Sequence, residues 1–229
     1  MAKRVVLLHS GIGDSRQWRR QVAALGGDFE VVAPDLPGFG REPMPGEPFS
    51  FVDFVSGFLP GALVGNSLGG GIALRTALAR PELVERLVLV ATGFPDWEWS
   101  QEIRENWARE EEAFEQGDLD RATELNLEFW VAPEHRDELR PQVLRSLEVE
   151  ASTPQPELRW PELQPLATLS VPTLVVVGDR DKSDFVDIAR HIAGEVQDAR
   201  LEVIEGAGHV VGVERPDELN ALLRDFLED

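Results

Sequence analysis

Short apolar runs alternate with stretches of helical periodicity along most of the chain. The apolar runs predict six buried strands, at residues 5–8, 31–33, 62–64, 87–90, 173–177 and 201–204. Helices are predicted after most of these runs, at about 17–25, 51–59, 70–79, 185–193 and 216–227. Strands that alternate with helices indicate βαβ units and a parallel sheet, so the chain is predicted to be an α/β protein.

Residues 94–165 interrupt this alternation. Helical patterns near 100–116, 119–130 and 134–150 follow one another without a strand, and the chain returns to the sheet at Val171-Pro172-Thr173. We therefore predict a helical lid at 94–165, inserted into a core made of 1–93 and 166–229. Five of the six tryptophans lie in the lid segment, where they either contact an apolar or aromatic substrate group or form part of the core.

Composition and charge exclude several classes of function. The chain has 229 residues and a net charge of −20, which argues against binding to nucleic acid or to anionic membranes. Residues 94–165 hold 19 acidic and 7 basic side chains, so 12 of the 20 excess negative charges fall on this segment. No apolar run reaches the roughly 18 residues of a membrane span, and the first one is too short for a signal peptide.

The lack of cysteine excludes disulfides and thiolate metal sites. No histidine pair or carboxylate cluster has the spacing of metal ligands, so neither a metal nor a cofactor is expected. A cytoplasmic location is the expectation for a chain of this kind.

The segment Ala-Leu-Val-Gly-Asn-Ser-Leu-Gly-Gly-Gly at 62–71 carries the strongest chemical motif. A predicted strand leads into Gly65-Asn66-Ser67-Leu68-Gly69, which matches G-x-S-x-G, and a predicted helix follows. This arrangement is typical of a nucleophile elbow, in which a strained turn between strand and helix exposes the serine. Ser67 is the candidate nucleophile.

A serine nucleophile needs a base, and the chain has four histidines. His135 and His191 lie in helical patterns as ordinary surface residues, and His9 ends the first strand. His209 lies in a glycine-rich loop between the last strand and the last helix, from which an imidazole can reach the elbow. His209 is therefore the candidate base. The acid that orients the base is expected directly after the predicted strand at 173–177. The segment there, Gly178-Asp179-Arg180-Asp181, offers two candidates.

These motifs together resemble the α/β-hydrolase superfamily over nearly the whole chain. The resemblance rests on His9-Ser10-Gly11, Asp35-Leu36-Pro37-Gly38-Phe39-Gly40, Gly65–Gly69, Asp181 and Gly208-His209. Among its members the chain is similar to small esterases, enol-lactonases and carbon–carbon bond hydrolases.

The resemblance also assigns the remaining site residues. In the family pattern the acid lies three residues after the glycine, which selects Asp181 over Asp179. The oxyanion hole is expected from the backbone N–H groups of Leu68 and Gly11, with Ile12 in place of Gly11 if the loop is shifted by one residue.

Two features differ from the family pattern. Most family members begin with a β-hairpin, which we do not expect here because the first predicted strand starts at about residue 4. The helix at 51–59 is also short, with Phe51, Phe54, Val55 and Phe58 as core residues. We expect a sheet of about six strands with residues 31–33 at an edge. A partner subunit, as in a homodimer, or the loop at 41–48 is predicted to cover that edge.

The function expected from the motifs is that of a serine hydrolase. It would cleave a carboxylic ester or lactone of a small molecule, with an apolar or aromatic group, through an acyl-enzyme. One alternative is hydrolysis of a carbon–carbon bond or enol-lactone in a carboxylate substrate. Another is a non-catalytic ligand-binding protein on the same fold.

Overall fold

A parallel six-stranded sheet lies at the centre of the computed structural model, which describes residues 2–228. The strand order is β2-β1-β3-β4-β5-β6. The strands are β1 Arg4–Leu8, β2 Glu30–Val32, β3 Gly61–Asn66, β4 Val84–Val90, β5 Thr173–Gly178 and β6 Ala199–Ile204. All six apolar runs therefore form strands, and the predicted α/β architecture with a sheet of about six strands is confirmed.

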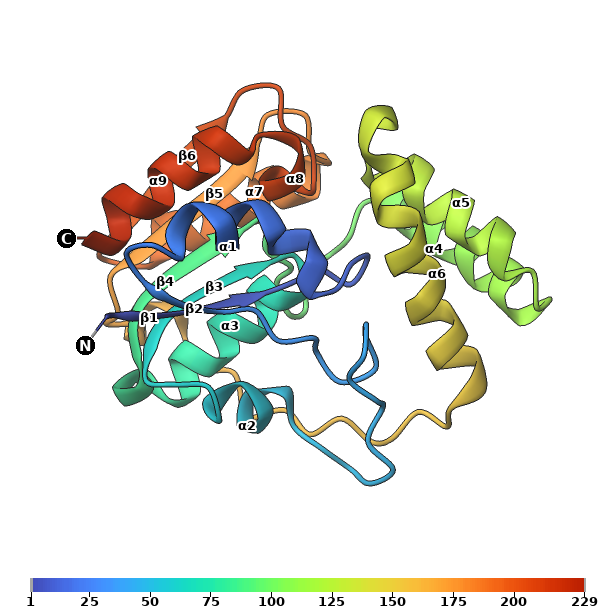
Figure 1. Cartoon of the computed structure of the whole chain (residues 1–229), viewed down its shortest axis with the longest axis horizontal. Coiled ribbons are helices and arrows are strands. Elements are labelled where there is room, and N and C mark those ends of the chain that lie inside the picture. The colour runs from blue at the N-terminus through green and yellow to red at the C-terminus, as the bar shows by residue number, and fades with distance from the viewer. Residues whose placement is uncertain (1, 229) are drawn as a thin grey trace.

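Helices cover both faces of the sheet (Figure 1). They are α1 Arg19–Leu25, α2 Phe51–Ser56, α3 Leu68–Ala79, α4 Gln101–Glu115, α5 Leu119–Trp130, α6 Arg136–Ser152, α7 Ser183–Glu195, α8 Val211–Glu214 and α9 Pro216–Glu228. Short 3-10 turns lie at Ser15–Trp18, Pro81–Leu83, Pro133–His135 and Leu166–Thr168.

Successive residues of each strand belong to different cores. Val6 and Leu8 pack with α2, α3 and α7 on one face, whereas Val5 and Leu7 pack with α1 and α9 on the other. The interior strands are buried on both sides, which explains why they appear in the sequence as unbroken apolar runs. The carboxyl ends of these strands carry the loops that form the site.

The bounds of several helices differ from the predicted ones. Helix α2 ends at Ser56 and not at 59, because Pro60 disfavours a helical conformation at the preceding residue and Gly57 caps the end. Helix α3 begins at Leu68, directly after Ser67. The stretches predicted at 17–25 and 134–150 each begin with a 3-10 turn before α1 and α6.

Strand β2 lies at an edge of the sheet, as expected. In the following loop, the Arg41 amide donates to Asp35 and the Met44 side chain packs on Gly38. Coverage of the β2 edge by this loop or by a partner subunit stays a prediction.

Helices α4, α5 and α6 lie between β4 and β5 in the chain and form a group beside the sheet (Figure 1). Ala113, Ala122 and Leu125 make a small core between these helices. Ile103, Leu127, Leu139 and Val143 instead join the core on the α3 face of the sheet. Residues 94–165, which include these three helices, are called the lid below, and their role as a lid stays a prediction.

Candidate active site

Ser67 lies on a tight turn between β3 and α3. Its φ of 53° is in the left-handed region, which costs free energy for a residue with a side chain. A Cβ atom on Gly65 would collide with the Gly69 carbonyl, and one on Gly69 would collide with the Leu8 carbonyl. The spacing of small residues around the serine is therefore required by the close passage of strand, helix and neighbouring loop.

His209 lies between β6 and α8 and reaches back over this turn. Its Nε2 is 2.9 Å from Ser67 Oγ, and its Nδ1 is 3.1 Å from both carboxylate oxygens of Asp181. A proton on Nδ1 is held by the carboxylate, which leaves Nε2 free to accept the Ser67 hydroxyl proton. The structure thus brings together the three residues predicted from the sequence as a catalytic triad.

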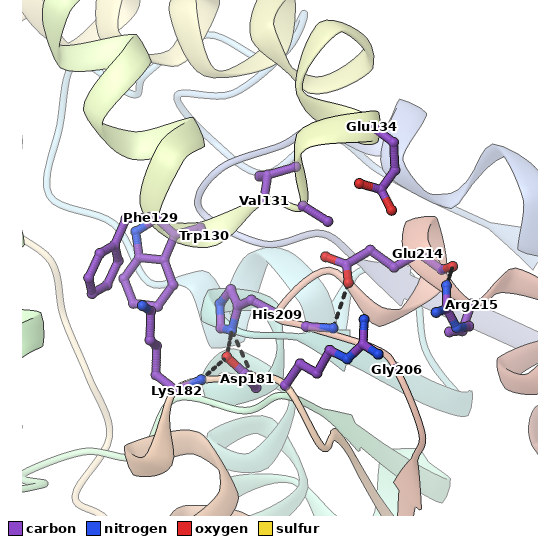
Figure 2. A pocket seen from close by; sticks show the side chains of 13 residues that line it. Phe129, Trp130, Val131, Glu134, Asp181, Lys182, Gly206, His209, Glu214 and Arg215 are labelled. Carbon is purple, nitrogen blue, oxygen red and sulfur yellow. Dashed lines mark hydrogen bonds and ion pairs between the residues drawn. The ribbon is translucent and has the colours of Figure 1, made fainter.

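The two aspartates after β5 have different partners. The Asp181 side chain is fully buried and also accepts the Lys182 N–H at 2.7 Å, so its position against His209 is fixed from two sides (Figure 2). Asp179 is exposed and accepts the Gly206 N–H at 2.6 Å. Asp179 therefore organises a turn.

Aromatic rings from two elements pack on the His209 imidazole. The ring centroids of Trp130, from the lid, and Phe185, from α7, lie 4.7 Å and 4.3 Å from that of the histidine. Trp130 is labelled above His209 in Figure 2. These contacts restrict the imidazole to the plane in which it faces Ser67, and one of them depends on the lid.

Gly11 and Leu68, the predicted oxyanion donors, are neighbours in space. A Cβ atom on Gly11 would lie 3.7 Å from Leu68 Cδ2. Within residues 2–228, the backbone N–H groups of Gly11 and Leu68 donate no hydrogen bond. The adjacent Gly69 N–H donates to the His9 carbonyl at 3.1 Å. The amide of Leu68 is also the first of helix α3, where the helix dipole favours negative charge.

A chain of buried amides ties these loops together. Gln17 accepts both the N–H and the hydroxyl of Ser10 through Oε1, at 3.0 and 2.8 Å, and donates to Asn66. Asn66 in turn donates to the His209 carbonyl at 3.2 Å. The sequence analysis missed this role of Gln17 and Asn66.

His9 and Glu214 support the same loops. The neutral ring of His9 donates to the Ser10 carbonyl at 2.8 Å and accepts the Leu36 N–H at 2.9 Å, and burial lowers the pKa of His9. Glu214 is buried, accepts the Gly208 N–H at 2.5 Å, and lies near that loop in Figure 2. Nothing in the sequence distinguishes Glu214 from the other acidic residues before the last helix.

A cavity of about 420 Å³ adjoins the candidate oxyanion donors, between the sheet domain and the lid. Gly11 and Leu68 line it together with Phe39, Phe49 and Phe51. The lid tryptophans are absent from this lining: Trp99 packs on Trp107 and Phe185, and Trp160 packs on Phe51 and Arg75. Phenylalanines of the core thus supply the aromatic lining that the sequence suggested the tryptophans could supply.

The described part of the chain, residues 2–228, contains no group of three or more histidine or acidic side chains arranged to hold a metal ion. Within the same residues, no helix combines the length and the apolar character needed to cross a bilayer.

Comparisons with known proteins agree with this geometry. The family model described as "Alpha/beta hydrolase family" matches residues 5–222. An uncharacterised protein of Mycobacterium tuberculosis is 39% identical over 98 residues, which is 38% of this chain and only 29% of that protein. The 2-hydroxymuconate semialdehyde hydrolase of a Pseudomonas strain is 26% identical over 96% of this chain and 83% of its own length.

Solved structures extend the agreement to the fold. A thermophilic esterase from Thermogutta terrifontis superposes with a TM-score of 0.79 at 24% identity, over 100% of this chain and 90% of the esterase. The family model covers nearly the whole sheet and lid, and the structure has the sheet and helix order of that fold. The chain therefore belongs to the alpha/beta hydrolase family.

Proposed function

We propose that the protein is a serine hydrolase that cleaves a carboxylic ester or lactone through an acyl-enzyme. One observation carries the proposal. Ser67 Oγ, the His209 ring and the Asp181 carboxylate form a continuous hydrogen-bonded chain, with contacts of 2.9 and 3.1 Å, beside the amides of Gly11 and Leu68.

In the first half of the reaction, His209 Nε2 takes the Ser67 hydroxyl proton as Oγ attacks the substrate carbonyl carbon. Asp181 accepts the hydrogen bond from Nδ1–H and stabilises the imidazolium that forms. The carbonyl oxygen becomes an oxyanion, which the N–H groups of Gly11 and Leu68 stabilise. The carbon–oxygen bond to the leaving alcohol then breaks, and His209 gives that alcohol its proton.

In the second half, water attacks the acyl-enzyme. His209 Nε2 removes a proton from the water as its oxygen bonds to the carbonyl carbon, and the same two amides stabilise the second oxyanion. The bond to Ser67 Oγ breaks, the serine regains a proton from His209, and the carboxylic acid leaves. A lactone follows the same steps and releases one hydroxy acid.

The mainly apolar lining of the cavity near Gly11 and Leu68 favours a substrate with an apolar group. The fold likeness to the Thermogutta terrifontis esterase agrees with ester hydrolysis. The similarity to the 2-hydroxymuconate semialdehyde hydrolase raises the alternative of a carboxylate substrate and carbon–carbon cleavage. Comparing kcat/KM for a neutral aryl ester and an anionic dienoate tests the alternative, since faster turnover of the dienoate would reverse the ranking.

The main test is a screen of p-nitrophenyl esters of increasing acyl length with the wild-type protein and Ser67→Ala. We expect turnover by the wild type and loss of nearly all of it in the variant. Turnover that survives Ser67→Ala would contradict the mechanism. A fluorophosphonate probe should label Ser67, and a protein that neither labels nor turns over any ester would instead be a ligand-binding protein on this fold.

A further inference from the structure

The cavity beside the oxyanion donors also reaches three polar side chains of the lid. Glu110 from α4, Asn126 from α5 and Glu150 from α6 line it together with Gly11 and Leu68. A group attached to the reacting carbonyl can therefore extend along phenylalanine side chains to a wall that offers carboxylate and amide oxygens. The mechanism proposed above makes no use of these three residues.

Glu110 is held in place within the lid and, within residues 2–228, forms no salt bridge with a cation. Asn106 and Asn126 donate to its two carboxylate oxygens through their Nδ2 groups. Burial raises the pKa of Glu110 to about 7, which is the effect expected when a carboxylate is desolvated without a positive partner. Beside it, the Asn126 Oδ1 atom is buried and has no hydrogen-bond partner. The Glu110 carboxylate at this wall therefore has amide donors but, among residues 2–228, no cation beside it.

A second cavity, of about 460 Å³, shares this wall with the first. Glu110, Asn126, Leu147 and Glu150 line both cavities. Trp107 and Phe114 line the second cavity, along with Glu111 and Glu115. Among residues 2–228, no lysine, arginine or histidine lines either cavity. Aromatic faces beside carboxylates are the surroundings in which proteins bind quaternary ammonium groups.

The position of the first cavity identifies which part of an ester would occupy it. The leaving alcohol must lie next to His209 Nε2, because that nitrogen gives it a proton. The cavity is lined by Gly11 and Leu68 but by no residue of the His209 loop. It therefore receives the acyl side of the substrate.

We propose that Glu110 determines specificity for acyl groups that carry a cationic ammonium group remote from the ester, and that it disfavours acyl groups ending in a carboxylate. The inference rests on the proposed ester hydrolysis and names its substrate class. The ammonium group binds against Glu110, with Glu150 adding negative charge. A terminal carboxylate would instead place a second negative charge in the same apolar surroundings, where no described side chain offsets it.

The test compares p-nitrophenyl esters whose acyl chains are similar in length and carry a positive charge, no charge or a negative charge. The acyl groups are 4-(trimethylammonio)butanoyl, its neutral isostere 5,5-dimethylhexanoyl, and the glutaric half-ester, together with longer members of each series. At pH 8.5 we expect kcat/KM for the best cationic ester to exceed that of its neutral isostere by about tenfold, the size of a charge-assisted contact. The anionic esters should be the slowest.

Glu110→Gln keeps the shape of the side chain and removes its charge. It should reduce the ratio of kcat/KM between the cationic and neutral esters by about tenfold, to a value near one. Glu112→Gln is the matched control. It removes the same charge from an exposed residue of α4 that lines neither cavity, and it should leave the ratio within about twofold, because exposed charges are screened.

Each other outcome has a definite meaning. A wild-type protein that prefers the neutral or anionic esters overturns the inference, and so does a cation preference that persists in Glu110→Gln or that is lost equally in Glu112→Gln. The wild-type order of the three esters decides the question even if Glu110→Gln does not fold. Failure of ester hydrolysis itself is recognised separately, by equal rates for the wild type and Ser67→Ala.

Discussion

Asp179 and Asp181 have the same side chain and lie two positions apart, yet their surroundings differ in every respect. Asp181 is buried against the His209 ring, while Asp179 is exposed and accepts a backbone amide. Only the buried carboxylate can hold the imidazole in the tautomer that accepts a proton from Ser67. The sequence alone offered both residues as the acid, and the family pattern was needed to select one.

Asp181→Asn is expected to lower kcat for an activated ester by up to about 10⁴-fold, because the amide no longer holds the required tautomer. Asp179→Asn should leave kcat within a few-fold of wild type, since the carboxylate accepts the Gly206 N–H and an asparagine Oδ1 can accept the same hydrogen bond. Steady-state kinetics on one p-nitrophenyl ester measures both. A large loss in Asp179→Asn with little change in Asp181→Asn would reverse the assignment.

The raised pKa of Glu110 predicts how stability varies with pH. With a folded-state pKa of about 7 against an ordinary value of 4.5, the folded protein keeps a proton that the unfolded chain has lost between these two pH values. Its contribution to stability is therefore fully present below pH 4.5 and is lost as the pH rises to about 7.

Comparison of wild type and Glu110→Gln by urea unfolding isolates this effect, because the other groups are shared. The wild type should lose roughly 3 kcal/mol relative to the variant between pH 4.5 and pH 8. Parallel curves for the two proteins would show that Glu110 has no raised pKa.

At the scale of elements, the site depends on a contact between four segments that are distant in the sequence. Gln17, in the 3-10 turn before α1, connects Ser10 after β1 to Asn66 at the end of β3, and Asn66 continues to the loop after β6. A buried amide that loses its partners leaves several polar atoms unsatisfied. These hydrogen bonds therefore position the loop after β1, which carries Gly11, relative to His209.

Gln17→Leu should cost about 1–3 kcal/mol of stability and also lower kcat more than it changes KM, because the oxyanion donors shift. Gln21→Leu is a matched control one helical turn later. Gln21 is equally buried, but its amide donates to the Gly212 carbonyl and not to the oxyanion loop or the elbow. A similar loss of kcat in both variants would mean that only general stability is affected.

For the molecule as a whole, the lid and the sheet share one hydrophobic core. Ile103, Leu127 and Leu139 of the lid belong to the same buried cluster as Leu8 and Leu63 of the sheet. The lid has only a small cluster of its own, around Ala113, Ala122 and Leu125. Neither part can lose its structure without exposing apolar surface of the other.

Calorimetry should therefore show a single unfolding transition, with a ratio of van't Hoff to calorimetric enthalpy of about 1. Two resolved transitions, with the first one abolished in a variant of the lid core such as Ala122→Asp, would show that the lid unfolds independently.

The sequence was sufficient where local pattern determines structure. The strands are buried on both faces and therefore form unbroken apolar runs, and the strained turn at Ser67 requires small residues at fixed spacing. The sequence alone was insufficient to predict contacts that depend on packing between distant segments. The burial of Glu110 depends on α5 and α6 packing beside α4, so the residue cannot be distinguished within a run of similar glutamates. Gln17 and Asn66, 49 residues apart, carry no motif that links them.

The parallel pairing of β4 with β5 has a consequence for how the protein can be shortened. The chain leaves β4 at its carboxyl end, Val90. It must enter the parallel strand β5 at Thr173, which lies at the opposite end of the strands. Parallel neighbours cannot be joined by a tight turn, and a crossover needs about a dozen residues or more. The lid is thus an enlarged crossover connection. A minimal enzyme designed from this scaffold could exchange the three helices for another segment, but it could not simply delete them.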